Sequence, residues 1–416
     1  MTKVNKWTLG LAAVGLVSLP AMVQAEEKPN QLLTALSSTT ISGYVDTSAQ
    51  WTLGSGNANP PGYSHNTPAK QDGFNLNVVD ITLEKPLDEG TWSAGYKAEL
   101  WFGPNAAVLG NNSGLGDGGN DVAVKQAYVA LRAPLGNGLD IKIGTWDTII
   151  GYEVANSGSN PNYTRSYGYT YEPTSQSGVL ASYQVSKVVG ISGGVANLWS
   201  AGIGGGVDRS PRSESKKSYL GAITLTAPDS WGDFAGSAFY AGVVDGYNTA
   251  VGNDVTSYYL GVTIATPIKA LKVGAAWDYV AGHDNSFANP NTDDAFTPTS
   301  NNGYSQSIAL YASVQATEKL SFHARGEWAK LSLGDNIGTP EDLDTETEAE
   351  EPSNTDTQEI WSLTGTIQYD LWANVLSRLE VRWDHASSDD SFGGTTKDEP
   401  RKQNEVIVAA NIIYKF

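Results

Sequence analysis

The chain has 416 residues, a formal net charge of -19 at pH 7 and no cysteine. Without cysteine it can form no disulfide framework, no thiolate metal site and no cysteine nucleophile. A chain this acidic also lacks the basic surface on which nucleic-acid binding depends. We therefore expect neither a nucleic-acid partner nor thiol chemistry.

The first 25 residues have the pattern of a secretory signal peptide. Lys3 and Lys6 precede an apolar stretch from Leu9 to Leu19, and Val23-Gln24-Ala25 has the small residues of a cleavage site. The stretch is shorter than the roughly 20 residues that span a bilayer, which argues against the alternative, an uncleaved anchor. We expect residues 1–25 to be the signal peptide, 26–39 a short periplasmic segment and 40–416 a transmembrane barrel.

Beyond the signal, the sequence alternates between apolar and polar residues in segments of about ten. Near the end of the chain, Leu379, Val381 and Trp383 share one face of a predicted strand, and four charged residues share the other. A soluble sandwich seldom covers four charges in succession, because unpaired buried charge is costly. A barrel with lipid outside and water inside requires this arrangement.

Sixteen segments of this kind predict an all-β fold, a transmembrane antiparallel barrel with an aqueous lumen. Short turns and long polar loops alternate between the segments, as in outer-membrane barrels. The predicted strands are 40–53, 74–87, 92–103, 122–135, 139–151, 177–186, 188–199, 217–228, 233–246, 256–268, 271–282, 304–317, 320–332, 359–372, 375–388 and 404–416. Alternation is weakest in 177–199 and 233–246, which are rich in small residues.

Three stretches carry a resemblance to a known family. They are Thr40-Ile41-Ser42-Gly43-Tyr44-Val45-Asp46-Thr47-Ser48, Asp147-Thr148-Ile149-Ile150-Gly151-Tyr152-Glu153, and Arg165-Ser166-Tyr167-Gly168 leading to Glu172-Pro173-Thr174 and Gly178-Val179-Leu180. With these stretches the chain resembles the OmpL-like outer-membrane β-barrel porin family. The resemblance spans essentially the whole mature chain. It implies a porin-like barrel in the bacterial outer membrane, and it names no solute.

The third long loop, 152–176, holds five tyrosines and one arginine. Tyrosine can pack its ring and still form hydrogen bonds, and arginine brings a fixed charge. We expect the loop to fold inward and form the pore constriction, as in other sixteen-stranded porins, with Arg165 facing solute. The constriction residues are then Glu153, Tyr163, Arg165, Tyr167, Tyr169 and Glu172. The alternative is an external loop that covers the barrel mouth or binds another surface.

Charged residues on the inward faces of the strands predict the lumen wall. We assign Lys97, Glu99, Arg132, Arg325, Glu327, Arg378, Glu380 and Arg382 to it. Two roles are open for the three arginines between 325 and 382. They could form a basic wall opposite an acidic loop, or they could satisfy the wall through mutual salt bridges.

Loop 333–358 carries nine acidic residues and no basic one. A solvated acidic loop is the favoured interpretation, and a cation site with Asp342, Asp344 and Glu346 as ligands is the weaker alternative. Either arrangement makes the mouth negative, which favours cations.

The sequence favours a porin, a passive and modestly cation-preferring diffusion channel for small hydrophilic solutes, with no cofactor. Its expected surroundings are the lipid bilayer and lipopolysaccharide, and analogy suggests a homotrimer. The alternatives are a sugar-type selective channel whose loop tyrosines stack on the solute, and a structural barrel that acts as an adhesin or sheathes a partner protein. An enzyme is not expected, because His385 near Ser387 has no evident orienting partner.

Overall fold

The structure is a computed structural model that describes residues 39–54, 72–88, 90–109, 121–201, 216–248, 253–282, 304–332, 357–387, 391–392 and 402–416. The predicted signal peptide and most of loop 333–358 lie outside these ranges. Within them, no helix has the length and apolar character needed to cross a bilayer.

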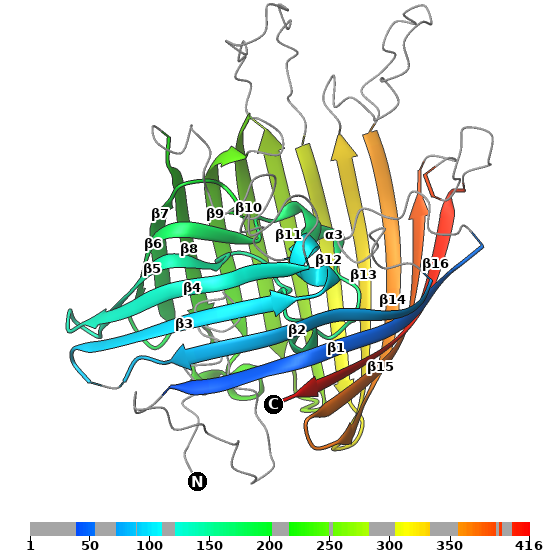
Figure 1. Ribbon diagram of the computed structural model, residues 1–416, viewed down its shortest axis with the longest axis horizontal. Coiled ribbons are helices and arrows are strands. Elements are labelled where there is room, and N and C mark those ends of the chain that lie inside the picture. The colour runs from blue at the N-terminus through cyan, green and yellow to red at the C-terminus, as the bar shows by residue number, and fades with distance from the viewer. Residues whose placement is uncertain are drawn as a thin grey trace, which may run out of the picture.

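The described residues form sixteen strands, each antiparallel to its neighbours in sequence, and β1 pairs with β16 to close a barrel (Figure 1). The strands are β1 (Thr40–Leu53), β2 (Gly73–Lys85), β3 (Ser93–Phe102), β4 (Val122–Ala133), β5 (Leu139–Asp147), β6 (Ser175–Gln184), β7 (Val189–Ala196), β8 (Ser218–Thr226), β9 (Ala238–Asn248), β10 (Asn253–Ala265), β11 (Leu271–Gly282), β12 (Tyr304–Gln315), β13 (Leu320–Ser332), β14 (Thr357–Trp372), β15 (Val375–Ala386) and β16 (Asn404–Lys415). The predicted fold class and all sixteen strands are confirmed.

The two strands at the seam are joined through the last residue of the chain. The backbone N–H of Gly43 donates to the carbonyl of Phe416 (3.1 Å), and that of Phe416 donates back to the carbonyl of Gly43 (3.0 Å). Closure removes the free edges that an open sheet would expose to lipid.

Exposure along the strands is the reverse of that in a soluble protein. On β15, Leu379 and Val381 are 51% and 48% exposed, whereas Arg378 and Arg382 are 3% and 0% exposed. Large apolar side chains therefore cover the outside and charged ones lie inside. A lipid-facing wall around a polar interior has this distribution.

Two predicted strands differ from the structure by four or more residues at one end. The strand expected over 139–151 ends at Asp147, because residues 148–151 turn into the barrel. The strand expected from 233 begins at Ala238, and the residues before it form a short 3-10 segment, η3 (Asp229–Phe234). Apolar residues occur in both regions, so the alternation does not mark where the pairing stops.

Candidate functional site

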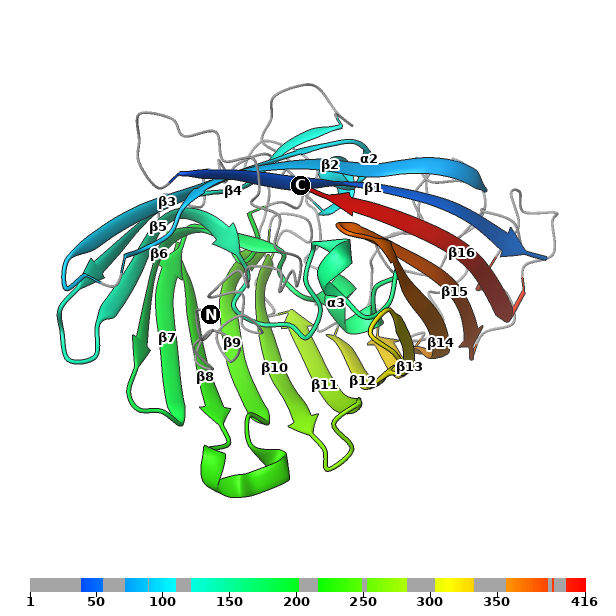
Figure 2. The same ribbon diagram turned by 90° about the horizontal axis from the view of Figure 1, so that it is seen from below.

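The connection from β5 to β6, residues 148–174, lies inside the barrel. It contains a 3-10 turn, η1 (Ser157–Ser159), and a short helix, α3 (Tyr167–Tyr171), which Figure 2 shows within the ring of strands. Its α3 contacts β11, β12 and β13. On another side, Tyr163 Oη donates to Ser48 Oγ on β1 (2.9 Å). Because it reaches separate parts of the wall, the loop crosses the interior, and the predicted inward fold is confirmed.

The loop holds its shape partly through its own side chains. Asn156 caps η1 by accepting from the N–H of Gly158 (3.0 Å), and Ser166 caps α3 by accepting from the N–H of Tyr169 (3.1 Å). The amide of Asn160 bonds both the N–H (2.9 Å) and the carbonyl (2.6 Å) of Val154. These contacts fix the chain locally before the wall contributes.

Three wall arginines bind carbonyl oxygens of this loop. Arg325 donates to the carbonyls of residues 164 (2.7 Å) and 165 (3.1 Å), and Arg382 donates to that of residue 165 (2.5 Å). Arg378 donates to the carbonyls of residues 157, 160 and 162 at 3.0–3.1 Å. A guanidinium presents several N–H donors in a fixed plane, so one side chain can hold several backbone groups.

Wall and loop carboxylates bind the N–H groups of the same segment. Glu380 accepts from the N–H groups of residues 163 (2.5 Å) and 164 (2.9 Å), and Glu327 accepts from that of residue 167 (2.7 Å). Glu153, which belongs to the loop, accepts from the N–H of Ser166 (2.9 Å) and from Arg325 Nη1 (2.9 Å). A peptide segment inside a barrel must satisfy its backbone polar groups, and these charged side chains do so.

The arginines thus have a different role from the two that the sequence left open. Arg325 and Arg382 do form ion pairs, with Glu153, Glu327 and Asp384. Their remaining donors bind the loop backbone, and their side chains are fully buried. They therefore act as a clamp on the loop and do not line the interior as a solvent-facing basic wall.

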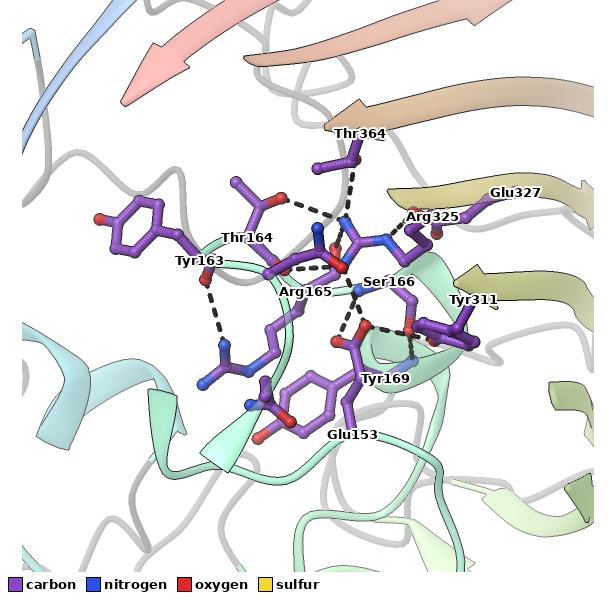
Figure 3. Close-up of polar contacts among 12 residues, drawn as sticks. Glu153, Tyr163, Thr164, Arg165, Ser166, Tyr169, Tyr311, Arg325, Glu327 and Thr364 are labelled. Atoms are coloured by element: carbon purple, nitrogen blue, oxygen red, sulfur yellow. Dashed lines mark hydrogen bonds and ion pairs between the residues drawn. The ribbon is translucent and has the colours of Figure 1, made fainter. Parts of the chain in front are cut away.

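The prediction that Arg165 faces solute is wrong. Its side chain is 0% exposed, and it donates to the carbonyl of Ala155 (2.7 Å). It also donates to the carbonyl of Tyr163 (3.1 Å), as Figure 3 shows. Its guanidinium also lies 5.5 Å from the centroid of the Tyr169 ring. Charge and hydrogen-bonding capacity made Arg165 look like a solute contact, but the folded loop uses both to stabilise itself.

The predicted constriction tyrosines come together inside the barrel and are buried. Tyr163 and Tyr167 anchor opposite ends of one short segment, the former to Ser48 and the latter through its hydroxyl to Asp384 (3.0 Å). The Arg382 guanidinium lies 5.0 Å from the ring centroid of Tyr167. These rings therefore pack against the wall and the loop.

Glu172 ends the helix α3 in a buried position. Burial, reinforced by the neighbouring Asp278, raises the pKa of the Glu172 carboxyl well above its usual range. This carboxyl is therefore a point at which pH can act on the loop.

Apolar contacts seat the first residues of the loop. The Tyr152 ring stacks on Tyr311 with centroids 4.0 Å apart. A Cβ at Gly242 would come within 2.5 Å of Ile150, and one at Gly274 within 2.1 Å of the Tyr152 hydroxyl. Small residues on the inner faces of β9 and β11 therefore make room for the loop. This explains the weak alternation at 233–246, which the sequence alone did not account for.

Charged residues on the remaining wall form local pairs. Lys97 lies 2.8 Å from Glu99, and Arg132 binds Asp140 through two hydrogen bonds of 2.6 Å. The prediction placed Lys97, Glu99 and Arg132 on inward faces but did not include Lys125, Asp140 and Lys142. Lys142 alternates with Ile141 and Ile143, so parity could have identified it, whereas a register shift in β4 hides Lys125.

The weaker cation-site candidates, Asp342, Asp344 and Glu346, lie outside the described residues. Within the described ranges, no cluster of three or more histidine, aspartate or glutamate side chains has the arrangement of a metal site.

Comparisons with known proteins agree with this architecture. A family model described as "Putative beta-barrel porin-2, OmpL-like" matches residues 38–416. A search of curated proteins found no match.

Several solved outer-membrane proteins share the fold at low sequence identity. OmpT of Vibrio cholerae is 11% identical with a TM-score of 0.53, and the match covers 93% of this chain and 100% of that one. DcaP, an outer membrane channel of Acinetobacter baumannii, is 14% identical with a TM-score of 0.51 and coverages of 91% and 97%. The anion-selective porin from Comamonas acidovorans is 11% identical with a TM-score of 0.51 and coverages of 91% and 99%.

Proposed function

Since the chain belongs to the OmpL-like β-barrel porin family and is an outer-membrane β-barrel channel, we propose that it passes small hydrophilic solutes and ions by passive diffusion. The loop of residues 148–174 would set the narrowest cross-section. The observation that carries the proposal is the clamp of Arg325, Arg378 and Arg382 on the loop backbone. A loop held this firmly narrows a bore by a fixed amount, which suits a permanently open channel.

A modest cation preference is part of the proposal. It rests on the chain's net charge of -19 and on the acidic sequence of loop 333–358. The described interior contributes little net charge, because its acidic and basic side chains are nearly balanced and many of them form ion pairs. A negative mouth concentrates cations near the entrance, and salt weakens this effect as the Debye length falls from about 10 Å at 0.1 M to 3 Å at 1 M.

The sugar-type alternative has less support. Tyr163, Tyr167 and Tyr169 are each 7% exposed or less, so these rings offer no open face on which a sugar could stack.

We also propose a homotrimer in contact with lipopolysaccharide. OmpT, a structural neighbour, has been solved in a trimer form (12% identity, TM-score 0.51, coverages of 91% and 99%).

A planar-bilayer recording of the purified protein tests the proposed function. We expect stepwise, ohmic conductance, a reversal potential that favours potassium over chloride at 0.1 M salt, and a smaller preference at 1 M. Saturable flux of one sugar would favour the selective channel. A silent bilayer together with a tightly bound protein would favour the structural barrel.

A further inference from the structure

The inner wall of β3–β5 carries four cationic side chains in the described residues, Lys97, Lys125, Arg132 and Lys142. Three of them hold a side-chain carboxylate. Lys97 binds Glu99, Lys125 binds Asp147, and Arg132 binds Asp140 through both carboxylate oxygens. Paired charges of this kind are the usual state of cations removed from bulk water.

Lys142 departs from this pattern. It faces the interior, because its cross-strand neighbour Ala130 is buried and the next residue, Ile143, is 46% exposed on the outside. Its ammonium lies 4.6 Å from the ring centroid of Tyr128, and its side chain is partly exposed. Throughout the described ranges, no carboxylate lies within ion-pair distance of it.

The local backbone makes room for this arrangement. Ala130 is too small to fill the space beside the lysine. Gly144 pairs with Tyr128 on the neighbouring strand and has a φ of 135°. A Cβ at this position would come within 2.3 Å of the Ala127 carbonyl oxygen, so only glycine fits, and no side chain stands beside the Tyr128 ring. The ammonium can therefore lie over the ring, which stabilises a cation without neutralising it.

Three acids lie near Lys142, namely Glu84, Asp140 and Asp147. Glu84 is beyond ion-pair distance of the ammonium, and the other two are bound to other cations. Asp140 is held at both oxygens by Arg132, and Asp147 is held by Lys125. The ring occupies one side of the ammonium, and a lysine has three N–H donors. Donors therefore remain for a ligand that comes from the interior of the barrel.

We propose that Lys142, seated on Tyr128, is a binding site for small carboxylate anions and raises their permeability through the channel. The three neighbouring cations each bind a carboxylate of the protein, so we expect Lys142, the fourth, to bind the carboxylate of a solute. This inference rests on the proposed channel function. Within a cation-preferring channel, the site would keep the preference modest by holding small carboxylates on the wall.

The test compares Lys142→Met with Lys142→Arg, which keeps the charge, in the full-length protein. Lys272→Met is the matched control, because Lys272 is an exposed lysine on the inner face of β11 and its loss changes the net charge equally. Reversal potentials in potassium acetate should show a fall of about threefold in acetate permeability relative to potassium for Lys142→Met, the size expected for one partly exposed ion pair. Lys142→Arg should stay near wild type, and Lys272→Met should change by less than half as much.

A binding measurement separates this site from the channel function. Line broadening of ¹³C-acetate by the detergent-solubilised protein should occur with wild type and Lys142→Arg and should be lost in Lys142→Met. Lys142-dependent broadening without conductance would refute the channel and keep the site. Equal broadening and equal permeability in wild type and Lys142→Met would overturn the site, and a larger effect on chloride than on acetate would overturn the carboxylate assignment.

Discussion

Replacing Arg325 by methionine should release the middle of the loop while leaving the barrel closed. The guanidinium binds the carbonyls of residues 164 and 165, the hydroxyls of Thr164 (3.1 Å) and Thr364 (3.3 Å), and the carboxylates of Glu153 and Glu327. Methionine keeps much of the volume and removes every one of these bonds. The strand pairing of β13 does not depend on them.

The cost follows from what remains after the substitution. Glu153 and Glu327 stay buried, and both lose their closest cation. Removing one partner of a buried ion pair costs about 3–5 kcal/mol, or about two to four orders of magnitude in the equilibrium between the docked and undocked loop. Arg378 still holds the carbonyls of residues 157, 160 and 162, and Arg382 still holds that of residue 165, so we expect partial undocking with frequent fluctuation.

Single-channel recordings of Arg325→Met should therefore show higher mean conductance and more open-channel noise than wild type. Arg132→Met is the control, since this arginine also forms a two-bond pair but is partly exposed, and such a pair contributes at most about 1 kcal/mol. Equal conductance and noise in the two variants would refute the idea that Arg325 clamps the loop.

Shortening the loop between residues 158 and 168 should raise single-channel conductance, because resistance concentrates at the narrowest cross-section; an unchanged conductance would place the constriction elsewhere. Glu172 has a raised pKa in the folded protein, so the stability that its neutral form contributes is complete below about pH 4.5 and falls as pH rises. The melting temperature of Glu172→Gln should gain on that of wild type between about pH 5 and 8, and parallel pH profiles would contradict the assignment. Gly43→Ala places a Cβ 2.1 Å from the Asp80 carbonyl oxygen and should lower the free energy of unfolding in urea by about 1–3 kcal/mol. Gly326→Ala is the control and should be neutral, because no atom lies within 4 Å of the added Cβ. Equal urea midpoints for these two variants would contradict the steric argument.

The sequence determined the barrel because lipid and water act on each residue separately. Alternation along β15 places Leu379 and Val381 in lipid and Arg378 and Arg382 inside, whatever the rest of the chain does. The same local rule identified all sixteen strands. The composition of one connection likewise supported the inward loop, since five tyrosines in a single loop suit burial better than exposure.

Only the tertiary structure decided what the buried charges do. Arg165, Arg325 and Arg378 have the same charge, but their partners lie from 2 to 221 residues away along the chain. Which carbonyl or carboxylate meets each guanidinium depends on the path of the loop across the barrel, and no periodicity encodes that path. Lys142 shows the same division. The alternation of the strand is enough to place it on the inner wall, but only the structure shows that, within the described residues, the neighbouring carboxylates are paired with other cations.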